Sequence, residues 1–506
     1  MVHISEFISL DDFESIVVGN NRVDLSEETV SRVEKSFNFL QSFAKNKIIY
    51  GVNTGFGPMA QYRISEEDQY QLQYNLIRSH SAGMGEVLDP LYARSVVLAR
   101  LQTLSLGHSG IHISVVNLMK EFLNRQIYPV IYKHGGVGAS GDLVQLAHLA
   151  LGLIGEGELW YKGKIKAAKE VFEKENLTPI EIHLREGLAL INGTSVMTGI
   201  GIVNVLYAKK LLNWSILTSS VINEIVKAYD DHFSEELNGV KKHRGQREVA
   251  KAMREILSDS RLIRKREDHL YTGEVKEFIF KEKVQEYYSL RCVPQILGPI
   301  METIENVEKT LMNEVNSAND NPIVDVHTQN VYHGGNFHGD YISLEMDKLR
   351  ICITKLSMLL ERQLNYLLNP SLNEILPAFV NLGTLGLNFG MQAAQFTATS
   401  TTAENQTLAT PIYTHSIPNN KDNQDIVSMG TNAALLTDKV IDNSFEILSV
   451  YALTLAQAID YLQCEDKISS RGKELFKEIR NIIPAFDQDD VLNPSLMKIK
   501  EYLKKI

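Results

Sequence analysis

The sequence predicts a mainly α protein, in which a bundle of long helices follows a more irregular N-terminal domain. Over 342–367 apolar residues recur at steps of three and four, and Pro370 ends the run, so this segment is predicted to be one long helix with an apolar stripe. A second such pattern covers 300–315, directly after a proline, and a third segment, 431–471, is rich in Ala, Leu and Ile and contains no Gly or Pro. Three helices of this length favour a bundle.

The first two hundred residues have a different character, because they are rich in glycine and broken into short segments. We therefore predict an N-terminal domain over 1–200 and a helical bundle domain over 201–506. Short apolar segments at 47–50 and 158–161 predict minor β-hairpins, and helical periodicity predicts a helix over 143–154.

Composition narrows the class of protein. The chain has 506 residues, of which 44% are hydrophobic and 22% charged, as in an ordinary globular protein. Its net charge of −11 argues against a dedicated nucleic-acid binder. Two basic clusters, 241–244 and 264–266, have acidic residues nearby and are interpreted as solvated loops.

The cysteines and the apolar segments of the sequence indicate the compartment in which the protein works. Three isolated cysteines, Cys292, Cys352 and Cys464, indicate neither a disulfide framework nor a metal motif, which favours a reducing compartment. The N-terminus lacks the basic start and apolar core of a signal peptide, and no apolar run approaches the length of a membrane span. We expect a cytoplasmic protein with no nucleic-acid or membrane partner.

The most informative segment is 138–143, Gly-Ala-Ser-Gly-Asp-Leu. Gly141 has no side chain, so its nitrogen is free to attack the Ala139 carbonyl. Cyclisation with loss of water, including the Ser140 hydroxyl, would leave a five-membered ring with an exocyclic methylene, which is a strong electrophile. The alternative is an ordinary glycine turn in which Ser140 or Asp142 caps the helix that follows. A phosphate-binding loop is disfavoured because no Gly-Lys-Ser/Thr follows.

Other segments carry candidate side chains but are individually ambiguous. Tyr50 precedes a glycine-punctuated loop, which is compatible with a packed aromatic residue or with a phenolic acid or base on a mobile lid. Arg291 has the guanidinium fork that suits a carboxylate, although an arginine taken alone is more often a structural ion-pair partner. His333 and His338 lack the spacing of a metal motif, and we predict no metal site.

Taken together and in order, these segments closely resemble the histidine/phenylalanine/tyrosine ammonia-lyase family from about residue 20 to 500. The matching phrases are YGVNTGFG, GVGASGDL, EGLALINGT, YSLRC, ANDNP, GGNFHGD and NQDIVSMG. The resemblance implies that Ala139, Ser140 and Gly141 form a 4-methylidene-imidazol-5-one (MIO) ring, that no external cofactor is needed, and that the protein is a homotetramer whose active sites draw on several subunits.

The resemblance also implies roles for individual residues. The ring methylene would take the substrate amine, Tyr50 would remove a β-proton, and Arg291 would clamp the carboxylate. Arg291 and helix N-termini are plausible sources of the positive potential that favours a phenolate. The ring-supporting and substrate-facing positions are Tyr288, Asn192, Gln285 and Phe337. The resemblance further implies that Glu404, Asn423 and Gln424 form another wall of the pocket.

The aromatic amino acid that serves as substrate is indicated less directly. In this family the pair at Ser79-His80 bears on ring selectivity, and Ser-His looks like the histidine-lyase version. The phrases GASGDLVQLAH, NFHGDYISLEMDKL and YTHSIPNNKDNQDIVSMG resemble a bacterial tyrosine ammonia-lyase group that also carries Ser-His. We therefore predict a tyrosine ammonia-lyase that forms trans-4-coumarate. The alternatives are a urocanate-forming histidine ammonia-lyase and an MIO-dependent aminomutase. A helical scaffold with a decayed site is disfavoured because Tyr50, Ser140 and Arg291 are all present.

Overall fold

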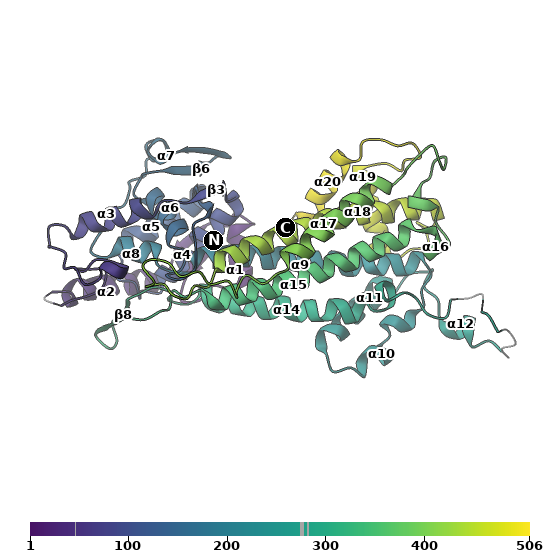
Figure 1. The fold of residues 1–506 in the computed structure, drawn as a ribbon, viewed down its shortest axis with the longest axis horizontal. Helices are drawn as coiled ribbons and strands as arrows, with labels where there is room; N and C mark the ends of the chain where they lie inside the picture. The colour runs from purple at the N-terminus through teal and green to yellow at the C-terminus, as the bar shows by residue number, and fades with distance from the viewer. Residues whose placement is uncertain (46, 274–277, 281–282, 506) are drawn as a thin grey trace. The chain divides into compact units, whose positions relative to one another are not determined.

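The computed structural model describes residues 1–45, 47–273, 278–280 and 283–505. These residues form two compact units, both dominated by helices (Figure 1). Unit 1 comprises Met1–Leu206, Val307–Asp347 and Pro411–Asp438, and unit 2 comprises Tyr207–Asn306, Lys348–Thr410 and Lys439–Ile506. The chain passes between the units once in the loop at Thr410–Pro411 and four times within long helices, which are α9 (Ser195–Ile225), α14 (Val293–Val315), α15 (Asp340–Leu368) and α18 (Gly430–Leu462).

Both units are discontinuous in sequence, because the chain returns to unit 1 twice after leaving it. The predicted domains, 1–200 and 201–506, are each continuous. Compact units are grouped by contacts and need not coincide with domains, so the division at residue 200 stays a prediction.

Unit 1 surrounds a core provided largely by α4 (Pro90–Ser105), nearly all of whose residues are buried. The Asp89 carboxylate caps this helix by accepting from the Leu91 N–H, and Pro90 opens it, which is a favourable arrangement for a helix N-terminus. The other helices that lie entirely in unit 1 are α1 (Leu10–Val17), α2 (Glu27–Phe43), α3 (Gln69–His80), α5 (Ile113–Arg125), α6 (Leu143–Leu153), α7 (Ala168–Glu175) and α8 (Glu186–Ile191).

Short strands complete unit 1. Strands β1 (Val2–Ile4) and β2 (Val23–Leu25) pair in parallel, and β3 (Met84–Val87) pairs antiparallel with β5 (Tyr132–His134). A three-stranded antiparallel sheet has the order β4 (Ile127–Pro129), β6 (Glu158–Tyr161), β7 (Lys164–Ala167). A hairpin is formed by β8 (Ile323–Asp325) and β9 (Asn330–Tyr332).

Unit 2 is built from helices. Those that lie entirely within it are α10 (Glu235–Gly239), α11 (Arg244–Leu257), α12 (Arg266–Leu270), α13 (Tyr288–Arg291), α16 (Pro370–Asn373), α17 (Gln392–Leu408), α19 (Ser470–Ile482) and α20 (Asn493–Lys504).

The predicted mainly α fold is confirmed, and several elements match. Helix α15 covers the segment predicted at 342–367, α6 covers most of 143–154, and the predicted hairpin at 158–161 is β6 paired with β7. Each of these elements carries its periodicity within a short window, which is the information that local sequence holds.

Three predicted elements are wrong in detail. Helix α14 begins at Val293 and continues through Pro299, because burial of its apolar face outweighs the lost hydrogen bond. The segment 431–471 is not one helix, since α18 ends at Leu462 and Gln463 takes a left-handed φ of 48°. Residues 47–50 form an irregular segment and a turn in place of a strand, although Ile49 is buried.

Two helices among the described residues, α9 and α18, are long and apolar enough to cross a membrane by length and composition. Their most apolar windows are 83% and 78% buried within the protein, as expected for the central helices of a bundle. These helices differ from the expectation that no apolar run approaches the length of a membrane span, because serines, threonines and asparagines interrupt their apolar residues without greatly lowering the mean hydropathy.

Candidate active site

The loop before α6 is anchored to the segment that precedes α18. Ala139 is only 4% exposed and packs with Val427 and Met429. The Ser428 hydroxyl donates to the Gly138 carbonyl over 2.9 Å, and the Met429 N–H donates to the Val137 carbonyl over 3.0 Å. These contacts therefore hold the loop in place next to the segment 427–429.

Two positions in this loop require glycine, because their backbone has a positive φ and because neighbouring atoms leave no room for a Cβ. Gly138 and Gly141 have φ values of 73° and 72°, in the left-handed region that glycine adopts at least cost. A Cβ at Gly138 would lie 2.1 Å from the Ser428 Oγ, and one at Gly141 would lie 2.0 Å from the Gly193 carbonyl oxygen. No side chain fits at either position without displacing its neighbour.

Asp142 ties the same loop to the start of α9. Its N–H donates to the Gly193 carbonyl over 2.8 Å, and its carboxylate accepts from the Val196 and Met197 N–H groups, each over 2.9 Å. The Thr431 hydroxyl also donates to it. Burial raises the pKa of Asp142 to about 6, against the lowering effect of these donors. The side chain thus caps α9, whereas the ordinary alternative, a side-chain cap on α6, is absent.

Ser140 lies between two side-chain amides. The Asn192 Nδ2 donates to the Ser140 carbonyl over 3.0 Å, and the Gln424 Nε2 donates to the Ser140 hydroxyl over 3.0 Å. The Asn192 Oδ1 is buried and has no hydrogen-bond partner within the described part of the chain. The amides of Asn192 and Gln424 donate to Ser140 from two sides, and Gly141 leaves space beside it. This arrangement fits a ring formed from residues 139–141.

Tyr50 occupies a turn in the loop 50–57. Its hydroxyl oxygen accepts from the Gly57 N–H over 3.0 Å, and its ring packs edge-on against Phe56 with the centroids 6.1 Å apart. This backbone donor would also stabilise a phenolate, the form of tyrosine that can accept a proton.

These groups share one cavity of about 880 Å³ in unit 1. The predicted residues that line it are Tyr50, Ser79, His80, Ser140, Asn192, Phe337, Asn423 and Gln424. Its volume is within the range typical of small-molecule sites. Segments far apart in the sequence thus converge on Ser140.

His80 lines this cavity at the C-terminal end of α3. Its Nδ1 lies 2.9 Å from the Leu76 carbonyl oxygen and 3.1 Å from the Ser79 Oγ. Burial lowers the pKa of His80, and the Leu76 carbonyl partly opposes that shift. Because a carbonyl oxygen only accepts, we assign the Nδ1 proton to that bond, which leaves Nε2 as a hydrogen-bond acceptor.

Ala139 and Gly141 also belong to unit 1, and the other predicted residues belong to unit 2. Gln285 and Tyr288 line a cavity of about 580 Å³, and Tyr288 is 70% exposed. The Arg291 guanidinium lies 4.8 Å from the centre of the Tyr288 ring. Among the described residues Arg291 forms no ion pair, and its Nε is buried without a partner. Glu404 on α17 accepts from the Asn443 Nδ2 over 2.7 Å.

Sequence reasoning missed several polar residues that line the unit 1 cavity. They are Asn75, Asn321, His333, Asn420 and Lys421. Helical spacing could have found Asn75, which lies one turn before Ser79 on α3. The others lie on loops, where no periodicity marks them. No group of three or more His, Cys, Asp or Glu residues in the described chain is arranged to hold a metal ion.

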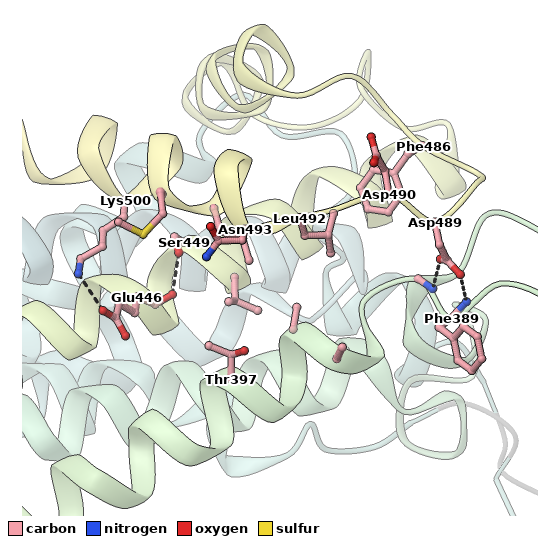
Figure 2. A pocket seen from close by; sticks show the side chains of 16 residues that line it. Phe389, Thr397, Glu446, Ser449, Phe486, Asp489, Asp490, Leu492, Asn493 and Lys500 are labelled. Atoms are coloured by element: carbon pink, nitrogen blue, oxygen red, sulfur yellow. Dashed lines mark hydrogen bonds and ion pairs between the residues drawn. The ribbon is translucent and has the colours of Figure 1, made fainter.

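A further cavity of about 530 Å³ lies in unit 2 between α17, α18 and α20 (Figure 2). Its polar groups bond to the protein itself. Lys500 pairs with Glu446 at 2.9 Å, and Asp489 accepts from the backbone N–H groups of Phe389 and Gly390 over 2.8 and 3.0 Å (Figure 2). None of the predicted site residues lines this cavity.

Comparisons of the sequence and of the structure with known proteins each find related enzymes that match nearly the whole chain. The sequence model of the family described as "Aromatic amino acid lyase" matches residues 8–481. Tyrosine 2,3-aminomutase of Myxococcus sp. (strain Mx-B0) is 37% identical over 501 residues, covering 97% of this chain and 95% of that protein. Histidine ammonia-lyase of Bacillus subtilis (strain 168) is 38% identical over 481 residues, covering 95% and 92%. The crystal structure of tyrosine aminomutase from Streptomyces globisporus is 33% identical, with a TM-score of 0.94 and coverage of 100% and 97%.

Proposed function

The chain belongs to the aromatic amino acid lyase family, and from this premise we propose that it is a cytoplasmic tyrosine ammonia-lyase. The reaction releases ammonia from L-tyrosine and gives trans-4-coumarate. The observation that carries the choice of tyrosine over phenylalanine is the acceptor at the His80 Nε2, in the side chain that lines the same cavity as Tyr50 and Ser140. A phenol hydroxyl donates to such an acceptor, whereas the ring of phenylalanine has no donor.

The proposed electrophile is an MIO ring formed from Ala139, Ser140 and Gly141. The ring, once formed, supplies an electrophilic methylene that takes the substrate amino group. Three features support this assignment: the tight approach of Gly141 to Gly193, the Asn192 amide on the Ser140 carbonyl, and the Gln424 amide on the Ser140 hydroxyl.

Other residues of the chain are proposed to remove the β-proton, to stabilise negative charge and to bind the substrate carboxylate. The Tyr50 oxygen is placed by the Gly57 N–H and, as the phenolate, is the proposed acceptor of the β-proton. The N-termini of α6 and α9 follow Ser140 and Asn192 in the chain, so their dipoles favour negative charge near the loop. Arg291, which lacks an ion-pair partner among the described residues, is the proposed clamp for the substrate carboxylate.

Arg291, Tyr288, Gln285 and Glu404 belong to unit 2, whereas the cavity around Ser140 belongs to unit 1. We propose that the protein is a homotetramer and that a complete active site takes these two groups of residues from different subunits.

The proposal is tested by incubating the purified protein separately with L-tyrosine, L-histidine and L-phenylalanine. Coumarate, urocanate and cinnamate are distinguished by their absorbance, and free ammonia is measured alongside. We expect coumarate to form fastest, with one ammonia released for each coumarate. Intact mass should show the protein lighter than its encoded sequence by two waters, and Ser140→Ala should lack that loss.

Two experimental outcomes would contradict the tyrosine ammonia-lyase reaction and favour the activity of one of the relatives instead. Faster formation of urocanate would favour histidine, the substrate of the Bacillus subtilis relative, because an imidazole N–H also donates to His80. Accumulation of β-tyrosine in excess of coumarate would favour the 2,3-aminomutase reaction of the Myxococcus relative. A protein with the full encoded mass and normal activity would exclude the MIO ring.

A further inference from the structure

A separate cavity of about 430 Å³ lies in unit 1 among α2, the turn after α4 and the β8–β9 hairpin. None of the residues that line the cavity around Ser140 lines this one. Its walls carry four basic side chains, Arg32 and Lys35 from α2, His108, and His327 from the turn of the hairpin. Glu6 is the one acidic residue in its lining.

Neither of the two permanent cations of this cavity is hydrogen-bonded to a carboxylate in the described part of the chain. The Arg32 Nη2 donates to the Thr29 hydroxyl over 3.1 Å and to the Ser105 carbonyl over 3.4 Å, and both of these acceptors are neutral. Within the described part of the chain neither Arg32 nor Lys35 forms an ion pair. Glu28 interacts with Arg32 electrostatically from one turn earlier on α2, without a hydrogen bond between them.

The two histidines, His108 and His327, add hydrogen-bonding ring nitrogens to the lining of the cavity. The His108 Nδ1 lies 3.1 Å from the Val324 carbonyl oxygen, so its Nε2 is the nitrogen left for a ligand. The Asp325 carboxylate accepts from the His327 N–H over 2.9 Å and from the Thr328 hydroxyl over 2.9 Å, and it interacts electrostatically with His327. Arg32 and Lys35 therefore supply the permanent positive charge that this cavity offers to an anion.

We propose that this cavity binds a small phosphate monoester. A guanidinium and an ammonium on one wall suit a doubly charged oxyanion better than a singly charged carboxylate. The apolar side chains of Leu106, Ala318 and Val326 offer contact to a short carbon skeleton. The volume fits a small metabolite. By contrast, the cations and acids of the unit 2 cavity in Figure 2 already pair with groups of the protein.

Isothermal titration of the full-length protein with glycerol 3-phosphate, inorganic phosphate, succinate and glycerol tests this assignment. We expect saturable binding of the two phosphates and weaker or no binding of succinate and glycerol. Lys35→Met should weaken binding of glycerol 3-phosphate about tenfold, as for loss of one charge-assisted hydrogen bond. Lys35 is exposed and makes no hydrogen bond or ion pair in the described structure, so this variant should fold normally.

The matched control is Lys164→Met, which removes an exposed lysine on β7 outside this cavity and should leave the affinity unchanged. Equal affinity of wild type and Lys35→Met would overturn the proposal, because it would place any bound phosphate elsewhere. Absence of saturable phosphate binding, or tighter binding of succinate, would also overturn it. Each of these outcomes is independent of the lyase reaction, since the assay measures binding and not turnover.

Discussion

Tyr50 and His80 are each held by a hydrogen bond within the fold and keep hydrogen-bonding capacity for the substrate. The Gly57 N–H donates to the Tyr50 oxygen and suits the phenolate that would accept the β-proton, while the His80 Nδ1 bonds to the Leu76 carbonyl and leaves Nε2 free. Both side chains are therefore oriented before any substrate arrives, which lowers the cost of reaching a reactive geometry.

Tyr50→Phe removes only a hydroxyl. We expect kcat for tyrosine to fall by at least about a hundredfold, the usual contribution of a positioned acid or base, and the free energy of unfolding to fall by about 1 kcal/mol. Steady-state kinetics and thermal unfolding check the two effects. The matched control is Tyr62→Phe, a 68% exposed tyrosine outside the cavity, which should leave both values unchanged. Wild-type kcat in Tyr50→Phe would exclude it as the base.

His80→Leu should change selectivity more than general activity. A phenol buried without its partner costs about 1–3 kcal/mol, so the ratio of kcat/KM for tyrosine over phenylalanine should fall roughly five- to a hundredfold. His80→Gln, which keeps an acceptor, should retain more of the ratio. An unchanged ratio in His80→Leu would show that another residue contacts the substrate ring.

The lowered pKa of His80 makes a prediction about pH. Because burial depresses the pKa below its ordinary 6.5, the neutral acceptor form is favoured in the folded protein, and its contribution is present above 6.5 and lost as pH falls through the folded value. KM for tyrosine should therefore stay level with respect to His80 above pH 6.5 and rise only in more acidic solution. Measurement of KM from acid to neutral pH, with His80→Gln for comparison, checks this. A His80-dependent rise that begins above pH 6.5 would show the opposite shift.

At the scale of elements, the loop between β5 and α6 is fixed by two neighbours that are remote in sequence. The segment before α18 bonds to it through Ser428 and Met429, and the start of α9 receives the Asp142 carboxylate. The geometry of 139–141 is therefore a product of contacts on both sides, and substitutions that disturb either contact should hinder ring formation.

Gly138→Ala tests this constraint against a matched glycine. Gly138 and Gly163 have φ values of 73° and 74°, but a Cβ at Gly163 meets no atom within 4 Å, whereas one at Gly138 meets the Ser428 Oγ at 2.1 Å. Gly163→Ala should cost only the backbone penalty of about 1–2 kcal/mol and still mature. Gly138→Ala should unfold at lower temperature, keep its full encoded mass and lack activity. Equal unfolding temperatures and normal ring formation in both variants would contradict this explanation.

At the scale of the whole molecule, the proposed active site needs residues from both units. Tyr50, His80 and Ser140 lie in unit 1, and Tyr288 and Arg291 lie in unit 2. If different subunits supply the two groups, one inactive variant should complement another.

Co-expression of Tyr50→Phe with Arg291→Ala tests this arrangement. Random assembly of a symmetric oligomer should give about a quarter of the sites both wild-type groups, and so about a quarter of wild-type activity. Each variant expressed alone is the control and should be inactive. If co-expression gives mixed oligomers that remain inactive, a single subunit supplies both residues.

The sequence by itself determined those features that depend on neighbours along the chain. Apolar spacing predicted α15 and α6, because a helix brings residues three and four apart onto one face. The chemistry of Ala139-Ser140-Gly141 is likewise local, since the glycine nitrogen and the alanine carbonyl are two residues apart. The order of the motifs indicated the family, which the comparisons confirm.

Only the tertiary structure decided which distant residues share a cavity and where individual helices begin and end. It brought Tyr50, His80, Asn192 and Gln424 into one cavity with Ser140, and it turned the Asp142 side chain to α9 in place of α6. It also continued α14 through Pro299 and ended α18 before Gln463. The physical reason is that such outcomes depend on burial and hydrogen bonds between residues distant in sequence, whose free energies exceed the local propensities that a sequence window reports.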